Sequence, residues 1–214
     1  MSHGTHAARR TEQLFSEAGA YREGHFKLKS GRHADRYVEK FAVLQWPAAV
    51  GELCGLLADS AREQSAGADV VVGPTTGGVI LAYEVARQLG VRGIFAEQEA
   101  GSDGTPRRVL RRGFRIEPGE RVLLVDDVVT TGASLKEMVP LIEDSGGELV
   151  ATVVLVDRTG GLRQVVSPVS ARAYPASALW TLDLPTFDPG PETCPGCAAG
   201  LALEAPGSSG TAAN

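Results

Sequence analysis

Two adjacent carboxylates followed by a short run of small and hydroxyl-bearing residues are the part of this sequence best suited to chemistry. An apolar run at 122–125 precedes them, and a helical pattern from Leu135 to Asp144 follows. A loop that leads from a strand into a helix N-terminus presents backbone N–H groups and the positive end of the helix dipole, so it favours an anion such as a phosphate. The residues of this stretch are Asp126, Asp127, Val128, Val129, Thr130, Thr131, Gly132, Ala133 and Ser134.

The two acids need a different partner, because carboxylates repel a phosphate. Asp126 and Asp127 suit the vicinal hydroxyls of a sugar, or a divalent cation that arrives together with phosphates. Ribose, phosphate and magnesium together suggest a phosphoribosyl donor. The alternative is an ordinary α/β loop in which an aspartate caps the helix.

The stretch resembles the 5-phosphoribosyl-1-diphosphate (PRPP) motif of type I phosphoribosyltransferases. A second segment, Gly-His-Phe-Lys-Leu-Lys-Ser-Gly-Arg-His at 24–33, is similar to the N-terminal hood of orotate phosphoribosyltransferases. The resemblance implies that Lys29 reaches orotate or the diphosphate. Taken alone, Lys29 would be assigned to the solvated face of a small hairpin; the surrounding motif favours the binding role.

A second loop of the same kind follows the apolar run at 68–73. It contains Thr75, Thr76, Gly77 and Gly78, and a helical pattern continues from there to Leu89. The loop has neither the lysine of a P-loop nor a Gly-x-Gly-x-x-Gly pattern, so nucleotide binding of those types is not indicated. The resemblance places a diphosphate-binding loop here, and it implies that Thr75 and Thr76 contact PRPP. The glycines fit that role or a tight turn.

The segment from Gln98 to Arg111 is rich in polar residues and lacks an apolar period, which predicts a mobile loop running into a short strand at 114–116. In the orotate family a flexible loop here closes over the site, and its basic residues neutralise the departing diphosphate. This sequence has no lysine in the loop, and Gln98 stands where many relatives place a basic residue. Arg107 and Arg108 are the candidates for the basic role; the alternative is a solvated basic loop.

An arginine follows the most apolar run of the chain, residues 149–156. The side chain of Arg158, at the C-terminal end of a predicted strand, should face the crevice where α/β sheets bind ligands. Its planar guanidinium binds a carboxylate through two hydrogen bonds. The resemblance assigns the orotate carboxylate to Arg158 and places Thr130 beside orotate. A turn with a local Asp157–Arg158 pair is the alternative.

Cys194 and Cys197 form a single Cys-x-x-Cys pair, which is half of a zinc site at best. A similar ending occurs in some bacterial relatives. The four histidines lie at positions 3, 6, 25 and 33, far from this pair in the sequence, so no further ligands are visible. We therefore interpret the pair as structural or unassigned. The same histidine placement argues against a Ser-His-Asp hydrolase.

The composition is that of a globular protein with one domain. The chain has 214 residues, of which 43% are hydrophobic and 22% charged, and its net charge is -5. An acidic balance argues against nucleic-acid binding, and no apolar run reaches the length of a membrane span. The N-terminus lacks the apolar segment of a signal peptide, and three cysteines do not suggest a disulfide framework. We therefore expect a cytoplasmic protein.

Alternating strand and helix patterns predict an α/β fold with a mainly parallel central sheet flanked by helices. The resemblance implies the type I phosphoribosyltransferase fold with a small N-terminal hood. We expect a disordered N-terminus at 1–10, a first helix from Thr11, one domain at 11–204 and a disordered tail at 205–214. Within the domain, the hood spans about 11–45, the core about 46–184 and a C-terminal extension about 185–204.

The implied reaction is transfer of ribose 5-phosphate from PRPP to orotate, which gives orotidine 5′-phosphate and diphosphate in de novo pyrimidine biosynthesis. The catalytic residues would be Asp126, Asp127, Arg107 and Arg108. Mg²⁺ would arrive with PRPP rather than bind side chains directly, and the family implies a homodimer. Two alternatives remain: a phosphoribosyltransferase for a purine base, and a non-catalytic regulator that senses PRPP.

Overall fold

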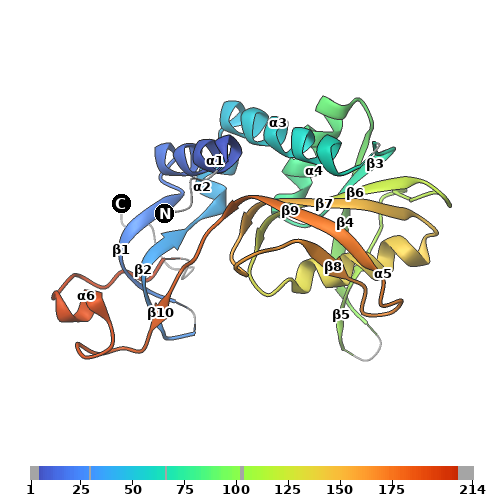
Figure 1. Ribbon diagram of the computed structural model, residues 1–214. Coiled ribbons are helices and arrows are strands. Elements are labelled where there is room, and N and C mark those ends of the chain that lie inside the picture. Colours follow the sequence, from blue (N-terminus) through green and yellow to red (C-terminus); the bar gives the residue numbers. More distant parts are fainter. Residues whose placement is uncertain (1–4, 29, 66, 102–103, 207–214) are drawn as a thin grey trace.

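A seven-stranded sheet forms the centre of the molecule in the computed structural model, which describes residues 5–28, 30–65, 67–101 and 104–206 (Figure 1). Its strands are β3 (Val70–Pro74), β4 (Arg92–Ala100), β5 (Pro106–Val109), β6 (Arg121–Val129), β7 (Glu148–Asp157), β8 (Gln164–Val166) and β9 (Ala173–Thr181). They lie in the order β5-β4-β3-β6-β7-β9-β8. The five central strands pair in parallel and the two edge strands pair antiparallel, which confirms the predicted mainly parallel sheet.

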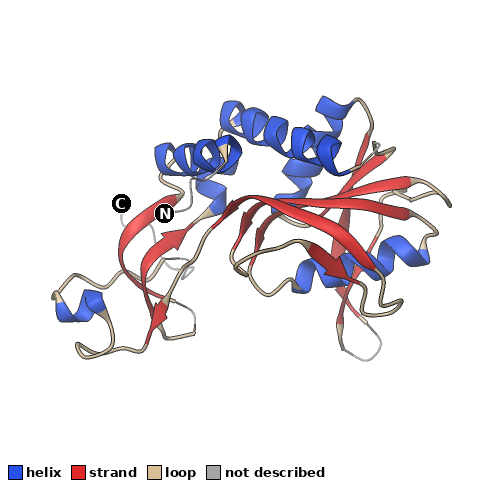
Figure 2. Cartoon of the chain, in the orientation of Figure 1, coloured by secondary structure: helices blue, strands red, loops and turns tan. Residues whose placement is uncertain are grey.

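Helices cover both faces of this sheet, as Figure 2 shows. They are α1 (His6–Glu17), α3 (Pro47–Gln64), α4 (Gly77–Leu89) and α5 (Ala133–Asp144). The short helix α2 (Lys40–Leu44) packs against α1, α3 and α4. Strand β6 explains why both faces need cover, because its side chains alternate between two buried clusters. Leu123 and Val125 pack with α3 and α4, whereas Val122 and Leu124 pack with α5. None of the helices in the described residues is long and apolar enough to cross a membrane.

The C-terminal ends of three neighbouring strands, β3, β6 and β7, meet at one edge of the sheet. Val72 of β3 lies beside Leu124 of β6, and Val129 at the end of β6 lies beside Asp157 at the end of β7. Parallel strands all point the same way, so the loops that follow them emerge together. The fold therefore brings the loops at 75–76, at 130–134 and after residue 157 to one place.

Two glycines allow α4 to begin directly against the end of β3. A Cβ atom on Gly73 would lie 2.2 Å from the carbonyl oxygen of Gly78, and one on Gly78 would lie 2.8 Å from Pro74 Cδ. Contacts that short do not occur between real atoms, so neither position accepts a side chain unless the backbone moves. Close packing of strand and helix is therefore one reason for glycine in this loop.

A separate three-stranded antiparallel sheet forms the hood. It consists of β1 (Tyr21–Lys27), β2 (His33–Val38) and β10 (Thr186–Phe187), in the order β1-β2-β10. The last strand comes from the C-terminal extension, which also carries the short helix α6 (Pro195–Ala198) beside the hood (Figure 1). The two ends of the chain thus build the hood together, although the sequence predicted only its first two strands.

The structure corrects three of the predicted elements. Helix α1 begins at His6 rather than Thr11, because the Thr5 side chain accepts a hydrogen bond from the Ala8 N–H at 3.2 Å and caps the helix. The segment predicted as a mobile loop forms the hairpin β4–β5, in which Glu99 lies opposite Arg107. Residues 114–116 are not a strand, and residues 1–4 and 207–214 lie outside the described part of the chain.

Candidate functional site

Asp126 and Asp127 lie in the last part of β6 and are almost completely buried, with exposed fractions of 5% and 2%. Asp126 accepts a hydrogen bond from the Ser134 hydroxyl at 2.7 Å through one oxygen and from the Asp127 backbone N–H at 2.8 Å through the other. Both of its oxygens are therefore engaged. The contact with Ser134 ties the strand to the first turn of α5, so the acid helps to shape the loop that follows it.

Lys40 forms an ion pair with Asp127. Its Nζ lies 2.8 Å from Oδ1 and 2.7 Å from Oδ2, and the backbone N–H of Val128 donates to Oδ1 at 2.6 Å. A buried carboxylate is costly unless a cation and hydrogen bonds compensate it, and these contacts provide both. Lys40 could not be identified from the sequence, because no regular spacing connects it with an acid so far along the chain.

Gly77, the first residue of α4, makes room for the Asp127 side chain. A Cβ atom at position 77 would lie 1.8 Å from Asp127 Oδ2. The sequence left open whether this glycine serves a tight turn or a binding loop. The structure gives it a third role, because it lets the helix backbone approach a catalytic candidate closely.

Asp126 has a strongly raised pKa. Burial, together with the charge of neighbouring Asp127, raises the pKa of Asp126 to about 6, although hydrogen bonds from Ser134 and the Asp127 N–H and the charge of Lys40 act in the opposite direction. A carboxyl group that titrates near neutral pH beside an exposed loop is typical of a functional site.

The loop after the acids has the geometry expected of an anion site. Thr130 and Thr131 are exposed, and Gly132 caps α5 in the left-handed conformation with φ 74°. The Lys136 N–H bonds back to the Gly132 carbonyl at 3.0 Å, so the backbone N–H groups just before it have no acceptor within the helix. These N–H groups, the hydroxyls and the helix dipole all favour a phosphate here.

Two further predicted residues, Arg108 and Gln98, lie beside the neighbouring loop of Thr75 and Thr76. The Thr75–Thr76 peptide bond is cis, and the Thr75 N–H donates to Ala96 O at 3.0 Å. The Arg108 side chain, of which only 7% is exposed, places Nη1 3.4 Å from the Thr75 carbonyl oxygen and Nε 2.9 Å from Glu137. Gln98 donates to the same Glu137 oxygen at 3.2 Å. Glu137 of α5 therefore joins Arg108 and Gln98 beside the loop.

The Arg107 side chain does not join this group of residues. It forms an ion pair with Glu99 at 2.6 Å, and 62% of its side chain is exposed. Arg107 and Arg108 are adjacent residues of a strand, so their side chains point to opposite faces. The structure therefore brings one of the two predicted arginines to the Thr75 loop and leaves the other at the surface.

Arg158 occupies the position predicted for it, at the end of β7 beside the acid loop. Its backbone N–H donates to Val129 O at 2.8 Å, next to Thr130. Its side-chain Nε is buried and has no hydrogen-bond partner among the described residues, and burial lowers the pKa of the guanidinium. A partly buried cation in this condition favours an anionic ligand.

Asp157 does not pair with Arg158, contrary to the local turn that the sequence left open. Its carboxylate instead accepts hydrogen bonds from the backbone N–H and hydroxyl of Thr159 at 2.7 and 2.6 Å, and from the Leu162 N–H at 2.7 Å. Burial alone would raise the pKa of Asp157, but these hydrogen bonds hold it below its ordinary value. Lys29 lies outside the described residues, so its role stays a prediction.

Comparison with known proteins agrees with this arrangement. Residues 42–170 match the family model described as a phosphoribosyl transferase domain. The orotate phosphoribosyltransferase of Caldicellulosiruptor bescii is 44% identical over 196 residues, which are 92% of this chain and 95% of the relative. The chain belongs to the orotate phosphoribosyltransferase family.

Other members of the orotate phosphoribosyltransferase family give the same result. The enzyme of that name from Thermotoga maritima is 41% identical over 200 residues, covering 93% of this chain and 98% of the relative. The crystal structure of orotate phosphoribosyltransferase from Aeropyrum pernix superposes with a TM-score of 0.65 at 27% identity, over 79% of this chain and 92% of that one. The predicted type I phosphoribosyltransferase fold is confirmed.

The raised pKa of Asp126 predicts a pH dependence of stability. The folded-state pKa of about 6 exceeds the ordinary value of 3.8, so between these values the folded protein binds more protons than the unfolded chain. The free energy of unfolding should therefore fall by about 1 kcal/mol between pH 5 and 7.5, relative to Asp126→Asn, which has no carboxyl group to titrate. Urea denaturation of both proteins at the two pH values measures this difference. A difference that did not change with pH would contradict the raised pKa.

Proposed function

We propose that this protein transfers ribose 5-phosphate from PRPP to N1 of orotate, forming orotidine 5′-phosphate and diphosphate in de novo pyrimidine biosynthesis. The observation that carries this proposal is the position of Arg158, a partly buried cation without an acid partner among the described residues, beside the loop suited to a phosphate. A carboxylate distinguishes orotate from other pyrimidine bases. The names of the relatives at 41–44% identity support the same substrate.

The residues around β6 would hold the ribose 5-phosphate part of PRPP. The loop from Thr130 to Ser134 at the start of α5 would bind the 5′-phosphate. Asp126 and Asp127 would hold the ribose hydroxyls, and their negative charge would stabilise the cationic, oxocarbenium-like sugar as the C1–O bond breaks. Because no side chain has to form a covalent bond, catalysis would consist of positioning and electrostatic stabilisation.

Lys40 fits this mechanism as a positioning residue. By holding both oxygens of Asp127, it fixes the carboxylate in one orientation and keeps its charge compensated while no substrate is bound. The missing side chain at Gly77 leaves the space that the carboxylate occupies in this orientation. Ribose hydroxyls would therefore meet a preorganised acid rather than a flexible one.

Mg²⁺ would enter with the substrate, as expected from the sequence. The side-chain oxygens of Asp126 and Asp127 are already engaged by Ser134, Lys40 and backbone N–H groups, so the acids suit hydroxyl groups better than direct coordination of an ion. The oxygen atoms of the diphosphate fit the preference of Mg²⁺ for hard ligands. When bound there, the ion would offset negative charge on the departing diphosphate.

The side chains beside the Thr75 loop would bind the diphosphate. Thr75 and Thr76 supply hydroxyls and backbone groups, and Gln98 supplies a side-chain amide. Arg108 supplies a positive charge that burial makes more effective, since little water screens it. It would stabilise the charge that develops on the leaving group.

We include a homodimer and a cytoplasmic location in this proposal. The apolar side chains of Phe41, Trp46 and Tyr83 are exposed by 43%, 57% and 70%, and Tyr83 lines an apolar groove formed by α2, α3 and α4, as expected of an interface. Sedimentation equilibrium should give the mass of two chains; the mass of one would reject the dimer.

The three cysteines are free thiols, as is usual in a reducing compartment such as the cytoplasm.

A panel of acceptor bases distinguishes the proposal from the two alternatives. The purified protein should release diphosphate from PRPP and Mg²⁺ with orotate, and not with adenine, hypoxanthine, guanine or uracil. Uracil is the matched control because it lacks only the carboxylate. Turnover with a purine alone would indicate a purine enzyme, and tight PRPP binding without turnover would indicate a regulator.

Arg158→Ala should raise the KM for orotate by about 10- to 100-fold, because a hydrogen bond to a charged group contributes roughly 1.5–3 kcal/mol. The KM for PRPP should change by less than about threefold. Arg172→Ala, which removes an exposed arginine stacked on Tyr174, is the control and should leave both values unchanged. Equal losses for orotate and PRPP would contradict the assignment of Arg158 to the carboxylate.

The two adjacent arginines of β5 should differ in their contribution to kcat. Arg108→Ala should lower kcat by about 10²-fold, the loss typical of removing one group that stabilises developing charge. Arg107→Ala is the matched control, since each variant loses one ion pair with a glutamate, and it should lower kcat by less than about threefold. Steady-state kinetics with saturating PRPP and orotate decide this. A larger loss for Arg107→Ala would show that the surface arginine acts, as a lid serving a neighbouring subunit would require.

A further inference from the structure

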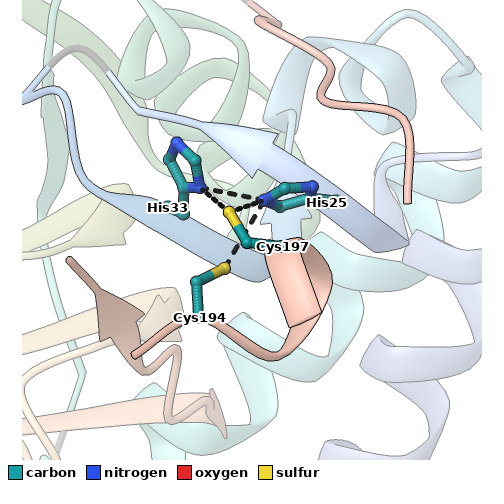
Figure 3. Close-up of side chains that lie close together, drawn as sticks. All are labelled: His25, His33, Cys194 and Cys197. Atoms are coloured by element: carbon teal, nitrogen blue, oxygen red, sulfur yellow. Dashed lines mark hydrogen bonds between the residues drawn. The ribbon is translucent and has the colours of Figure 1, made fainter. Parts of the chain in front are cut away.

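Two histidines of the hood and two cysteines of the C-terminal extension form a cluster outside the site described above. His25 lies on β1, His33 begins β2, Cys194 is the N-cap of α6, and Cys197 lies within α6. Figure 3 shows that all four side chains point toward one another. Their potential ligand atoms lie within 4.8 Å of one another, and this is the one group of such residues in the described part of the chain that could hold a metal ion.

From these residues we propose that the protein binds a structural zinc ion through His25, His33, Cys194 and Cys197. Two imidazoles and two thiolates are a common ligand set of tetrahedral structural zinc sites, in which the protein fills every coordination position. The two thiolate charges would balance the charge of Zn²⁺, so the complete site would be neutral, as its burial requires. The site is therefore structural rather than catalytic.

The distances between the side chains fit a tetrahedral zinc ion. With Zn–N near 2.05 Å and Zn–S near 2.3 Å, tetrahedral geometry places two nitrogens about 3.3 Å apart and a nitrogen and a sulfur about 3.6 Å apart. The structure has 2.9 Å between His25 Nε2 and His33 Nδ1. It has 3.3–3.5 Å for the three contacts of sulfur with nitrogen. Small side-chain movements would bring all four atoms to ligating distance.

The contacts around the cluster prepare His25 to act as a ligand. Its Nδ1 lies 3.0 Å from the carbonyl oxygen of Leu201, which requires the proton on Nδ1 and leaves the lone pair of Nε2 facing the other three residues. Backbone acceptors of this kind commonly fix the tautomer of histidines that bind metals. The Leu201 N–H in turn donates to Gly196 O at 3.0 Å. Leu201 therefore contacts both His25 and the turn between the two cysteines.

Gly196, between the two cysteines, allows the turn to pack against the imidazole. A Cβ atom there would lie 2.5 Å from Cγ of His25. The Cys-Pro-Gly-Cys turn can therefore pack this closely against His25 only if position 196 has no side chain. The glycine thus serves the contact between the turn and the histidines, and not only the conformation of the turn.

The small size of the hood explains why a metal would matter here. Its sheet has three strands, one of them only Thr186–Phe187, and its buried apolar members Phe26 and Ala34 belong to neither of the two large core clusters. A unit with so little apolar core usually needs a disulfide or a metal for stability. The proposed site joins positions 25 and 33 to positions 194 and 197, so it would hold the extension onto the hood.

Metal analysis of the reduced full-length protein tests the proposal without any assay of activity. The protein purified from cells should contain about one zinc ion per chain by mass spectrometry of the metals. Cys194→Ser and Cys197→Ser should each lose most of the bound zinc. Cys54→Ala is the matched control, because Cys54 is buried in the main core and contacts no proposed ligand, and it should keep the full amount.

Cobalt titration of the wild-type protein keeps the test decisive if a variant does not fold. After chelation of zinc under reducing conditions, Co²⁺ should give the visible bands of tetrahedral coordination and a thiolate-to-cobalt band in the near ultraviolet, and an equivalent of Zn²⁺ should abolish both. Absence of zinc in the purified protein together with absence of these bands would overturn the proposal. A disulfide between Cys194 and Cys197 in protein from the cytoplasm, seen as the loss of two hydrogens in the intact mass, would also overturn it.

Discussion

The buried pair of acids on β6 is the constraint on which the rest of the site depends. Two adjacent carboxylates below 6% exposure can exist only where the surrounding structure compensates their charge. Lys40 comes from the chain that leaves the hood, Ser134 from the next helix, and the space at Gly77 from the helix before. Three elements are therefore fixed in place by the requirements of two side chains.

The core and most of the site were predictable because local patterns carry them. The apolar runs at 68–73, 122–125 and 149–156 lie in strands that are buried on both faces, and the residues that follow these runs include the predicted threonines, acids and Arg158. Parallel strands order these loops along one edge, so their proximity follows from the fold. The predicted position of Arg158 followed from its place at the end of a strand, whereas its assignment to the orotate carboxylate rests on the resemblance.

The contacts that sequence reasoning missed all connect distant parts of the chain. Lys40 and Asp127 are separated by 87 positions, and His25 and Cys194 by 169. No period or spacing encodes such a pair. The two histidines were not recognised as ligands because they are far from the cysteines in the sequence, although they lie close to them in space. The segment at 98–111 was predicted as a loop because it lacks an apolar period, whereas the opposite charges of Glu99 and Arg107 pair across two strands of a hairpin.

The hood and the acid pair are connected through one short stretch of backbone. Strand β2 begins at His33 and ends at Val38, and Lys40 begins α2 two residues later. Glu39 anchors this connection, because its N–H donates to Ala20 O at 2.8 Å and its side chain accepts from the Phe41 N–H at 3.2 Å. Contacts that fix the position of β2 therefore also restrain Lys40, whose ammonium group orients Asp127. A cluster that ties His33 to the C-terminal extension would thus stabilise the geometry of the acids from a distance, although none of its four residues belongs to the site.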